Sequence, residues 1–211
     1  MKFALAIAAA LIATPAAAQS PVKPTALLFN GLAQYQPGIL TPLAPLASDL
    51  RAQGWRVVID THLGLYSKSE EPVLIVGHSA GGARAYMFGK RMADEAKFHP
   101  LIITLDAATV WGDVYRCPVE SCINIHTLTY PKIAGSYNLR AGNITNSIVT
   151  HVSIPFNSDI RKAILQQAAD LMRGGSNLTT LVSAYSPEPP TAGRSLAEAW
   201  RRNIGQPRET H

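Results

Sequence analysis

The residues with the clearest chemical potential form the pattern G-x-S-x-G, at Gly77-His78-Ser79-Ala80-Gly81. A short apolar run at 73–76 precedes the pattern and residues at helical spacing follow it, which predicts a serine on a tight turn between a strand and a helix. Such a turn strains the backbone of Ser79 and needs small neighbours two residues away, as Gly77 and Gly81 are. It would present the hydroxyl at a helix N-terminus, which favours an oxyanion. The alternative interpretation is a glycine-rich turn with an incidental serine.

The acid that such a serine needs is predicted at Asp106. A serine hydroxyl becomes a nucleophile only beside a general base, which an acid orients. In strand-turn-helix serine sites, the acid and then the histidine follow the serine along the chain, each after a strand. Asp106 directly follows the apolar run 101–105, whereas the alternative acid, Asp113, follows a loop. The competing interpretation of Asp106 is an aspartate that only forms a turn.

The base is predicted among six histidines. His151 is preferred because it lies between a Gly- and Asn-rich loop and a capped helix, after the acid. His126 is the alternative, but it falls inside a predicted strand, where a hydrogen-bonded core histidine is the commoner finding. His78 is expected to point away from the serine hydroxyl and to serve in packing or support. The others lie before the acid, at the wrong sheet edge or in the tail, at His62, His99 and His211.

Two backbone N–H groups are the candidate oxyanion donors. One belongs to Ala80, the residue after the nucleophile. The other belongs to Leu32, in the loop after the first predicted strand, where Gly31 allows close approach of the backbone. These groups make a complete site for acyl transfer, and no metal or organic cofactor is implied.

The surrounding sequence alternates strands with helices. Short apolar runs predict five strands and a short sixth, at 26–29, 56–60, 73–76, 101–105, 122–128 and 149–154. Helices are expected near 43–54, after the serine turn, and over 159–173 with a cap at Ser158 or Asp159. The polar segment 61–71 has room for a short helix, and 131–147 is expected to be loop. The fold class is therefore α/β, a mostly parallel sheet of about six strands with helices on both faces.

The two ends differ from this pattern. Lys2, an apolar stretch and Ala16-Ala17-Ala18 before Gln19 predict a bacterial signal peptide over residues 1–18. The alternative is a buried N-terminal helix. A single domain is expected over 19–182, and a Pro-containing tail, loosely attached or disordered, over 183–211. No other apolar run approaches the ~20 residues of a transmembrane helix, so a periplasmic or extracellular protein is expected.

Composition and cysteines agree with an exported globular protein. The chain has 211 residues, 16% of them charged, and a net charge of +5. Its basic residues are scattered along the sequence, which argues against nucleic-acid binding. Cys117 and Cys122, with a short loop between them, predict a disulfide in an oxidising compartment. The alternative is two reduced thiols.

Over about residues 26–173 the chain resembles α/β-hydrolases of the lipase, esterase and thioesterase kind. The segments that carry the resemblance are Phe29-Asn30-Gly31, Gly77-His78-Ser79-Ala80-Gly81-Gly82, Thr104-Leu105-Asp106-Ala107-Ala108 and His151-Val152-Ser153-Ile154. The family often has His-Gly where this chain has Asn30-Gly31, and often places its acid one strand later, where 122–128 carries no carboxylate. Some lipases place the acid earlier, as Asp106 would be.

The resemblance implies a secreted serine hydrolase without a large cap domain, acting on a small-molecule or lipid ester or on a thioester. Ser79 would attack the carbonyl, with His151 as base and Asp106 as its orienting acid. Two other classes stay open: an acyltransferase on the same scaffold, and a non-catalytic binding protein that has kept the fold.

Overall fold

A computed structural model of the chain describes residues 23–32, 41–95, 99–108, 116–119, 121–141 and 148–174. The predicted signal peptide, the predicted tail, Asp113 and His211 lie outside the described residues. Among the described residues, no helix combines the length and apolar character needed to cross a bilayer.

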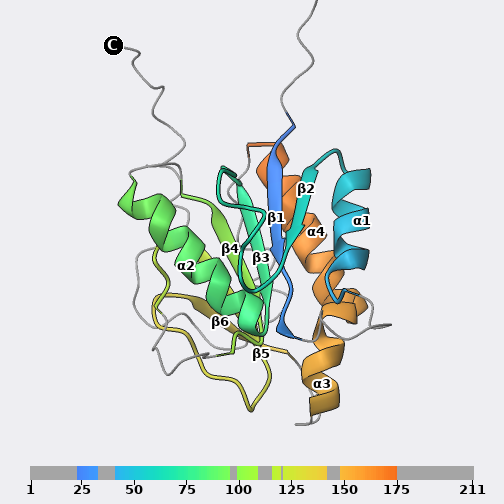
Figure 1. Ribbon diagram of the computed structural model, residues 1–211. Coiled ribbons are helices and arrows are strands. Elements are labelled where there is room, and N and C mark those ends of the chain that lie inside the picture. The colour runs from blue at the N-terminus through green and yellow to red at the C-terminus, as the bar shows by residue number, and fades with distance from the viewer. Residues whose placement is uncertain are drawn as a thin grey trace, which may run out of the picture.

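The described residues form a six-stranded sheet in which every neighbouring pair is parallel (Figure 1). Its order is β2-β1-β3-β4-β5-β6. The strands are β1 Thr25–Phe29, β2 Arg56–Asp60, β3 Leu74–His78, β4 Leu101–Leu105, β5 Cys122–His126 and β6 Tyr137–Arg140. The predicted α/β class and parallel sheet are confirmed.

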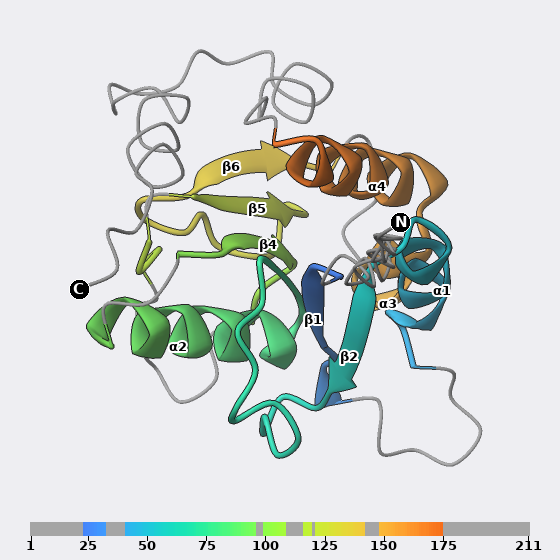
Figure 2. The same ribbon diagram turned by 90° about the horizontal axis from the view of Figure 1, so that it is seen from above.

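Helices cover both faces of the sheet (Figure 2). The α2 helix (Ala80–Asp94) packs on one face, where Phe88 and Met92 meet Leu27 and Ile75 of the strands. The α1 helix (Ala44–Ala52) and the α4 helix (Ser158–Met172) pack on the other face. Since successive strand residues point to opposite faces, strands buried on both sides appear as the continuous apolar runs seen in the sequence.

The strand order creates a switch point between β1 and β3. From β1 the chain continues to β2 on one side, whereas from β3 it continues to β4 on the other side. In open parallel sheets, ligands bind outside the carboxyl ends of the strands at such a point. The loop after β1 and the serine turn after β3 both lie there.

Two predictions in the C-terminal half are wrong. The segment expected to be loop contains β6, and the expected sixth strand at 149–154 is instead the α3 helix (Ile148–Ser153) followed by a 3₁₀ turn, Ile154–Phe156. Asn138 explains the first error, because its amide has partners on Asn124, Ile133 and Ser136 that compensate for the poor strand propensity of asparagine. The second segment is rich in β-branched residues, but tertiary context outweighs that weak preference.

The expected cap of the last helix is also corrected. The α4 helix is capped by Asn157, not by Ser158 or Asp159, since the Asn157 side chain accepts the N–H groups of Asp159 and Ile160. Both accepted N–H groups belong to the first turn, which is the usual action of an asparagine cap.

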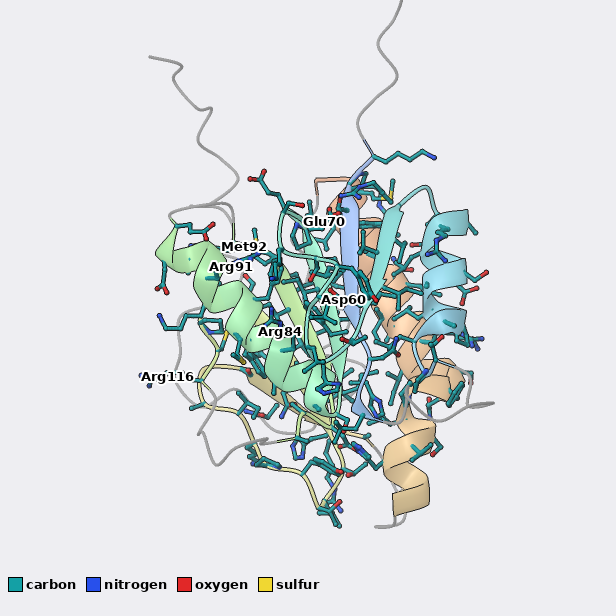
Figure 3. All side chains as sticks on the ribbon, viewed as in Figure 1. Asp60, Glu70, Arg84, Arg91, Met92 and Arg116 are labelled. Carbon is teal, nitrogen blue, oxygen red and sulfur yellow. A yellow bond between two sulfur atoms is a disulfide. The ribbon has the colours of Figure 1, made fainter. Side chains whose placement is uncertain are left out.

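The segment 61–71 forms turns and no helix. The buried Asp60 carboxylate accepts the N–H groups of Thr61, Leu65 and Tyr66 at 2.7, 3.1 and 2.9 Å, which holds the chain in an irregular loop. Arg84 of α2, labelled with Asp60 in Figure 3, interacts with the charge of the Asp60 carboxylate. The Arg84 guanidinium packs against Gly64 so closely that a Cβ atom on that glycine would overlap it.

The predicted disulfide between Cys117 and Cys122 is present, and no free cysteine occurs in the chain segments described. It ties the start of β5 to the segment before it. The structure therefore favours the disulfide over the alternative of two reduced thiols.

Replacing both cysteines with alanine is expected to lower the free energy of unfolding by about 2 kcal/mol, because a short disulfide-closed loop restricts the unfolded chain by roughly that amount. Denaturant unfolding of the wild type and of the Cys117→Ala/Cys122→Ala variant measures this difference. The wild type in reductant serves as the matched control and should be as destabilised as the variant. Equal stability of all three would contradict the prediction.

Candidate active site

Ser79 lies on a strained turn between β3 and α2. Its backbone angles are φ 56° and ψ −126°, a conformation that costs a non-glycine residue about 1–3 kcal/mol. Hydrogen bonds on both sides hold it there. Its N–H donates to the Leu105 carbonyl at 3.0 Å, and its own carbonyl accepts N–H groups from Gly82 at 2.8 Å and Ala108 at 3.0 Å. The serine is thus fixed to both β4 and α2.

The small neighbours required by the turn are explained by close packing. A Cβ atom on Gly77 would overlap the Gly81 carbonyl, and one on Gly81 would overlap the Phe29 carbonyl of β1. Neither glycine has a positive φ. Their role is therefore close backbone approach, so that the first turn of α2 can rest against the end of β1.

The loop after β1 lies directly on the serine. A Cβ atom on Gly31 would sit 2.8 Å from the Ser79 Cβ and 3.3 Å from its Oγ. Asn30 anchors this loop, since its N–H donates to the Asp60 carbonyl at 3.0 Å and its side-chain Oδ1 accepts the Leu43 N–H at 3.1 Å. Leu32 follows Gly31 and its side chain is exposed. Of the two predicted oxyanion donors, Ala80 directly follows Ser79, and Leu32 directly follows Gly31, which packs on Ser79. Ala80 is the first residue of α2, so its N–H has no acceptor within the helix.

Gly31→Ala is expected to lower kcat for ester hydrolysis by about 10²-fold, because the added methyl group displaces the serine and displacements near 1 Å cost about that much. Steady-state kinetics and thermal unfolding test this together. Gly54→Ala is the matched control, since Gly54 has φ 97°, lies at the end of α1 and leaves only an ordinary contact for a Cβ atom. That control should lose stability and keep kcat; equal kcat losses in the two variants would contradict the prediction.

Asp106 is fully buried directly after β4, at φ 45°. Its Oδ1 accepts the Thr127 N–H at 2.6 Å, and its Oδ2 accepts the Thr127 hydroxyl at 3.2 Å. The same Oδ2 lies 3.3 Å from His151 Nδ1. A buried carboxylate needs such partners. The structure therefore brings together the acid and the histidine that the sequence predicted.

His151 lies in α3, and its side chain is 12% exposed. Its Nδ1 faces Asp106, so that nitrogen carries the proton in the neutral ring and Nε2 is the basic nitrogen. The Tyr130 ring stacks on it, with centroids 4.4 Å apart and planes at 11°. The His78 ring lies 4.8 Å away, and His78 Nε2 donates to the His151 carbonyl at 2.9 Å.

The alternative base, His126, has a different environment. It is buried at the end of β5, and its Nδ1 lies 2.9 Å from the carbonyl of the adjacent Thr127. This matches the hydrogen-bonded core histidine considered from the sequence. The hydrogen bond to Asp106 comes from His151.

Sequence reasoning missed Thr127 and Tyr130. Thr127 follows β5 at the same sheet edge as Asp106, so a polar residue after a strand was an available signal. Tyr130 lies three residues further, in a turn, where no pattern marked it. Burial and the nearby Asp106 carboxylate raise the pKa of Tyr130, which keeps the phenol neutral beside the histidine.

Burial and, secondly, the nearby His151 imidazole lower the pKa of His78 from 6.5 to about 4. A hydrogen bond to the His151 backbone and the charge of Asp106 act in the opposite sense and are the smaller contributions. Between these values the unfolded chain binds a proton that the folded protein does not. The free energy of unfolding is therefore not reduced by His78 above pH 6.5. It falls by up to about 3 kcal/mol as the pH is lowered towards 4.

His78→Gln is accordingly expected to reduce the loss of stability between pH 7 and pH 4, because glutamine does not titrate. Urea unfolding of both proteins across this range measures the effect. An identical pH dependence of the free energy of unfolding in the two proteins would contradict the prediction.

In comparisons with known proteins, no family model, no curated protein and no solved structure matches this chain. The arguments for function therefore rest on the residues and the geometry described above.

Proposed function

We propose that the protein is a serine hydrolase of the α/β-hydrolase kind, without a large cap domain, that cleaves a carboxylic ester or thioester. The observation that carries the proposal is the contact of Asp106 with His151, at the same sheet edge as a serine on a strained turn. A turn-forming aspartate would not explain a buried carboxylate that faces an imidazole. Strained residues held by their surroundings gather at active sites, which favours catalysis over an incidental serine.

In the proposed reaction, the Ser79 Oγ attacks the substrate carbonyl carbon while His151 Nε2 accepts the hydroxyl proton. The tetrahedral intermediate collapses, the bond to the leaving group breaks, and His151 gives the proton to the departing alcohol or thiol. Water then attacks the acyl-enzyme with His151 again as base. The acid product leaves and the serine hydroxyl is restored.

The other groups of the proposed site orient the base or stabilise the charges that form during the reaction. Asp106 holds the tautomer that leaves Nε2 free, and its carboxylate stabilises the imidazolium that forms. Thr127 fixes that carboxylate from the end of β5. The N–H groups of Leu32 and Ala80 are the proposed oxyanion donors, and each donor of this type contributes about 10²–10³ in rate.

Exposed apolar side chains near this edge support an apolar substrate. Leu32 follows β1, Leu128 follows β5, and Val152 is adjacent to His151; all three are exposed. Burial of an acyl chain against them would contribute about 25 cal/mol per Å² of apolar surface removed from water.

A chain-length series of p-nitrophenyl esters tests the proposal, with and without an added alcohol as acceptor. We expect the rate of hydrolysis to increase from the acetyl ester to esters of longer acyl groups, with the free acid as product. An ester of the added alcohol as the main product would instead identify an acyltransferase. No turnover at any chain length would contradict the proposed hydrolase.

We further propose that the chain is exported, with removal of residues 1–18. The disulfide is compatible with an oxidising compartment. N-terminal sequencing of the protein from a bacterial periplasmic or culture fraction should begin at Gln19. An intact Met1 in the exported fraction would contradict cleavage at this site.

A further inference from the structure

The His78 side chain contacts His151 on one face of the sheet. His78 is the last residue of β3 and immediately precedes Ser79. Leu74 and Val76, which alternate with it, belong to the core on the face covered by α1 and α4. The His78 side chain therefore leaves the strand on the face opposite α2, and there it meets His151 of α3.

The contact between the two histidines has a defined direction. A carbonyl oxygen only accepts, so the 2.9 Å contact with the His151 carbonyl places a proton on His78 Nε2. Its Nδ1 is buried and has no partner among the described residues, which suits a neutral ring. Its Nε2 is therefore committed to the His151 carbonyl, and the Asp106 carboxylate that orients a base contacts His151, not His78.

The helix that carries His151 depends on such contacts. The α3 helix spans only Ile148–Ser153, and a helix of that length is not stable through its own hydrogen bonds. His78 is 4% exposed and belongs to a central strand, so it offers a rigid attachment. The link bypasses 72 intervening residues and joins the base directly to the turn that carries the nucleophile, as the sequence separation of 73 shows.

We propose that His78 is a positioning residue, which holds the His151 imidazole in register with Ser79 through its hydrogen bond to the His151 carbonyl and its ring contact. The inference rests on the proposed hydrolase function. His78, the residue before the proposed nucleophile, thereby has a role of its own. One turn presents the Ser79 hydroxyl and also supports His151, the proposed base.

Two substitutions separate positioning from packing. His78→Gln keeps a donor at the same number of bonds from the backbone, whereas His78→Met fills a similar volume without a donor. The Met variant should lose kcat by about 10–100-fold with KM unchanged, because misplacement of a catalytic group acts on the transition state. The Gln variant should restore kcat to within about threefold of the wild type. His99→Met, the same change at the opposite sheet edge, should leave kcat unchanged.

Imidazole ¹⁵N–¹H spectra of the full-length protein give a readout that is independent of turnover. The His151 ring signals should shift in His78→Met and stay close to wild type in His78→Gln. Equal kcat losses in both variants, with unmoved His151 signals, would overturn the proposal, as would wild-type kcat and signals in His78→Met. If the wild type hydrolyses no ester, the proposed function fails, and the His151 signals alone decide whether His78 positions this ring.

Discussion

Ser79→Ala is expected to lower kcat for ester hydrolysis by about 10⁶-fold, which is the usual cost of removing the nucleophile from a serine triad. The physical reason is that no other group can form the acyl-enzyme, so only binding and the oxyanion donors remain. Steady-state kinetics with a p-nitrophenyl ester measures the loss. Near wild-type turnover in a folded Ser79→Ala protein would contradict the assignment.

Ser79→Gly provides a matched control on the backbone. Both variants lack the hydroxyl, but glycine adopts φ 56° without the steric cost that alanine retains. The Gly variant should be as inactive as the Ala variant and more stable than it by about 1 kcal/mol. Denaturant unfolding compares them, and a less stable Gly variant would show that the turn is not strained.

His151→Ala should cost kcat about 10⁴–10⁶-fold, because the serine then has no base and the leaving group has no acid. His126→Ala is the control, since the His126 ring bonds to the carbonyl of its neighbour and the Asp106 contact comes from His151. The control should keep turnover of the wild-type order. Circular dichroism and thermal unfolding must show both variants folded. The opposite pattern, with loss in His126→Ala alone, would move the base to His126.

Local patterns explain which features could be predicted. The turn at Ser79 is specified by residues within two positions, and Asp106 by its place directly after an apolar strand. Chain order then selected His151, whose Nδ1 does face Asp106. These features depend on short stretches and on the rule that carboxyl ends of parallel strands meet at one edge.

Features that depend on distant contacts could not be predicted in the same way. Asn138 favours a strand only because its amide bonds to Asn124 and Ile133. The α3 helix has a strand-like sequence, and its carbonyl at His151 is bonded by His78, 73 positions earlier in the chain. Thr127 is marked in the sequence only by its place after a strand, and its partner Asp106 lies 21 positions earlier in the chain. In each case the partners are brought together by the fold.

The most direct test of the proposed triad is labelling of the folded protein with a fluorophosphonate, followed by peptide mass spectrometry. The hydrolase proposal predicts one adduct, on Ser79, that forms quickly in the wild type and far more slowly in His151→Ala. A folded wild type that forms no adduct, or forms it on another residue, would contradict the proposal and favour a binding protein on the same fold.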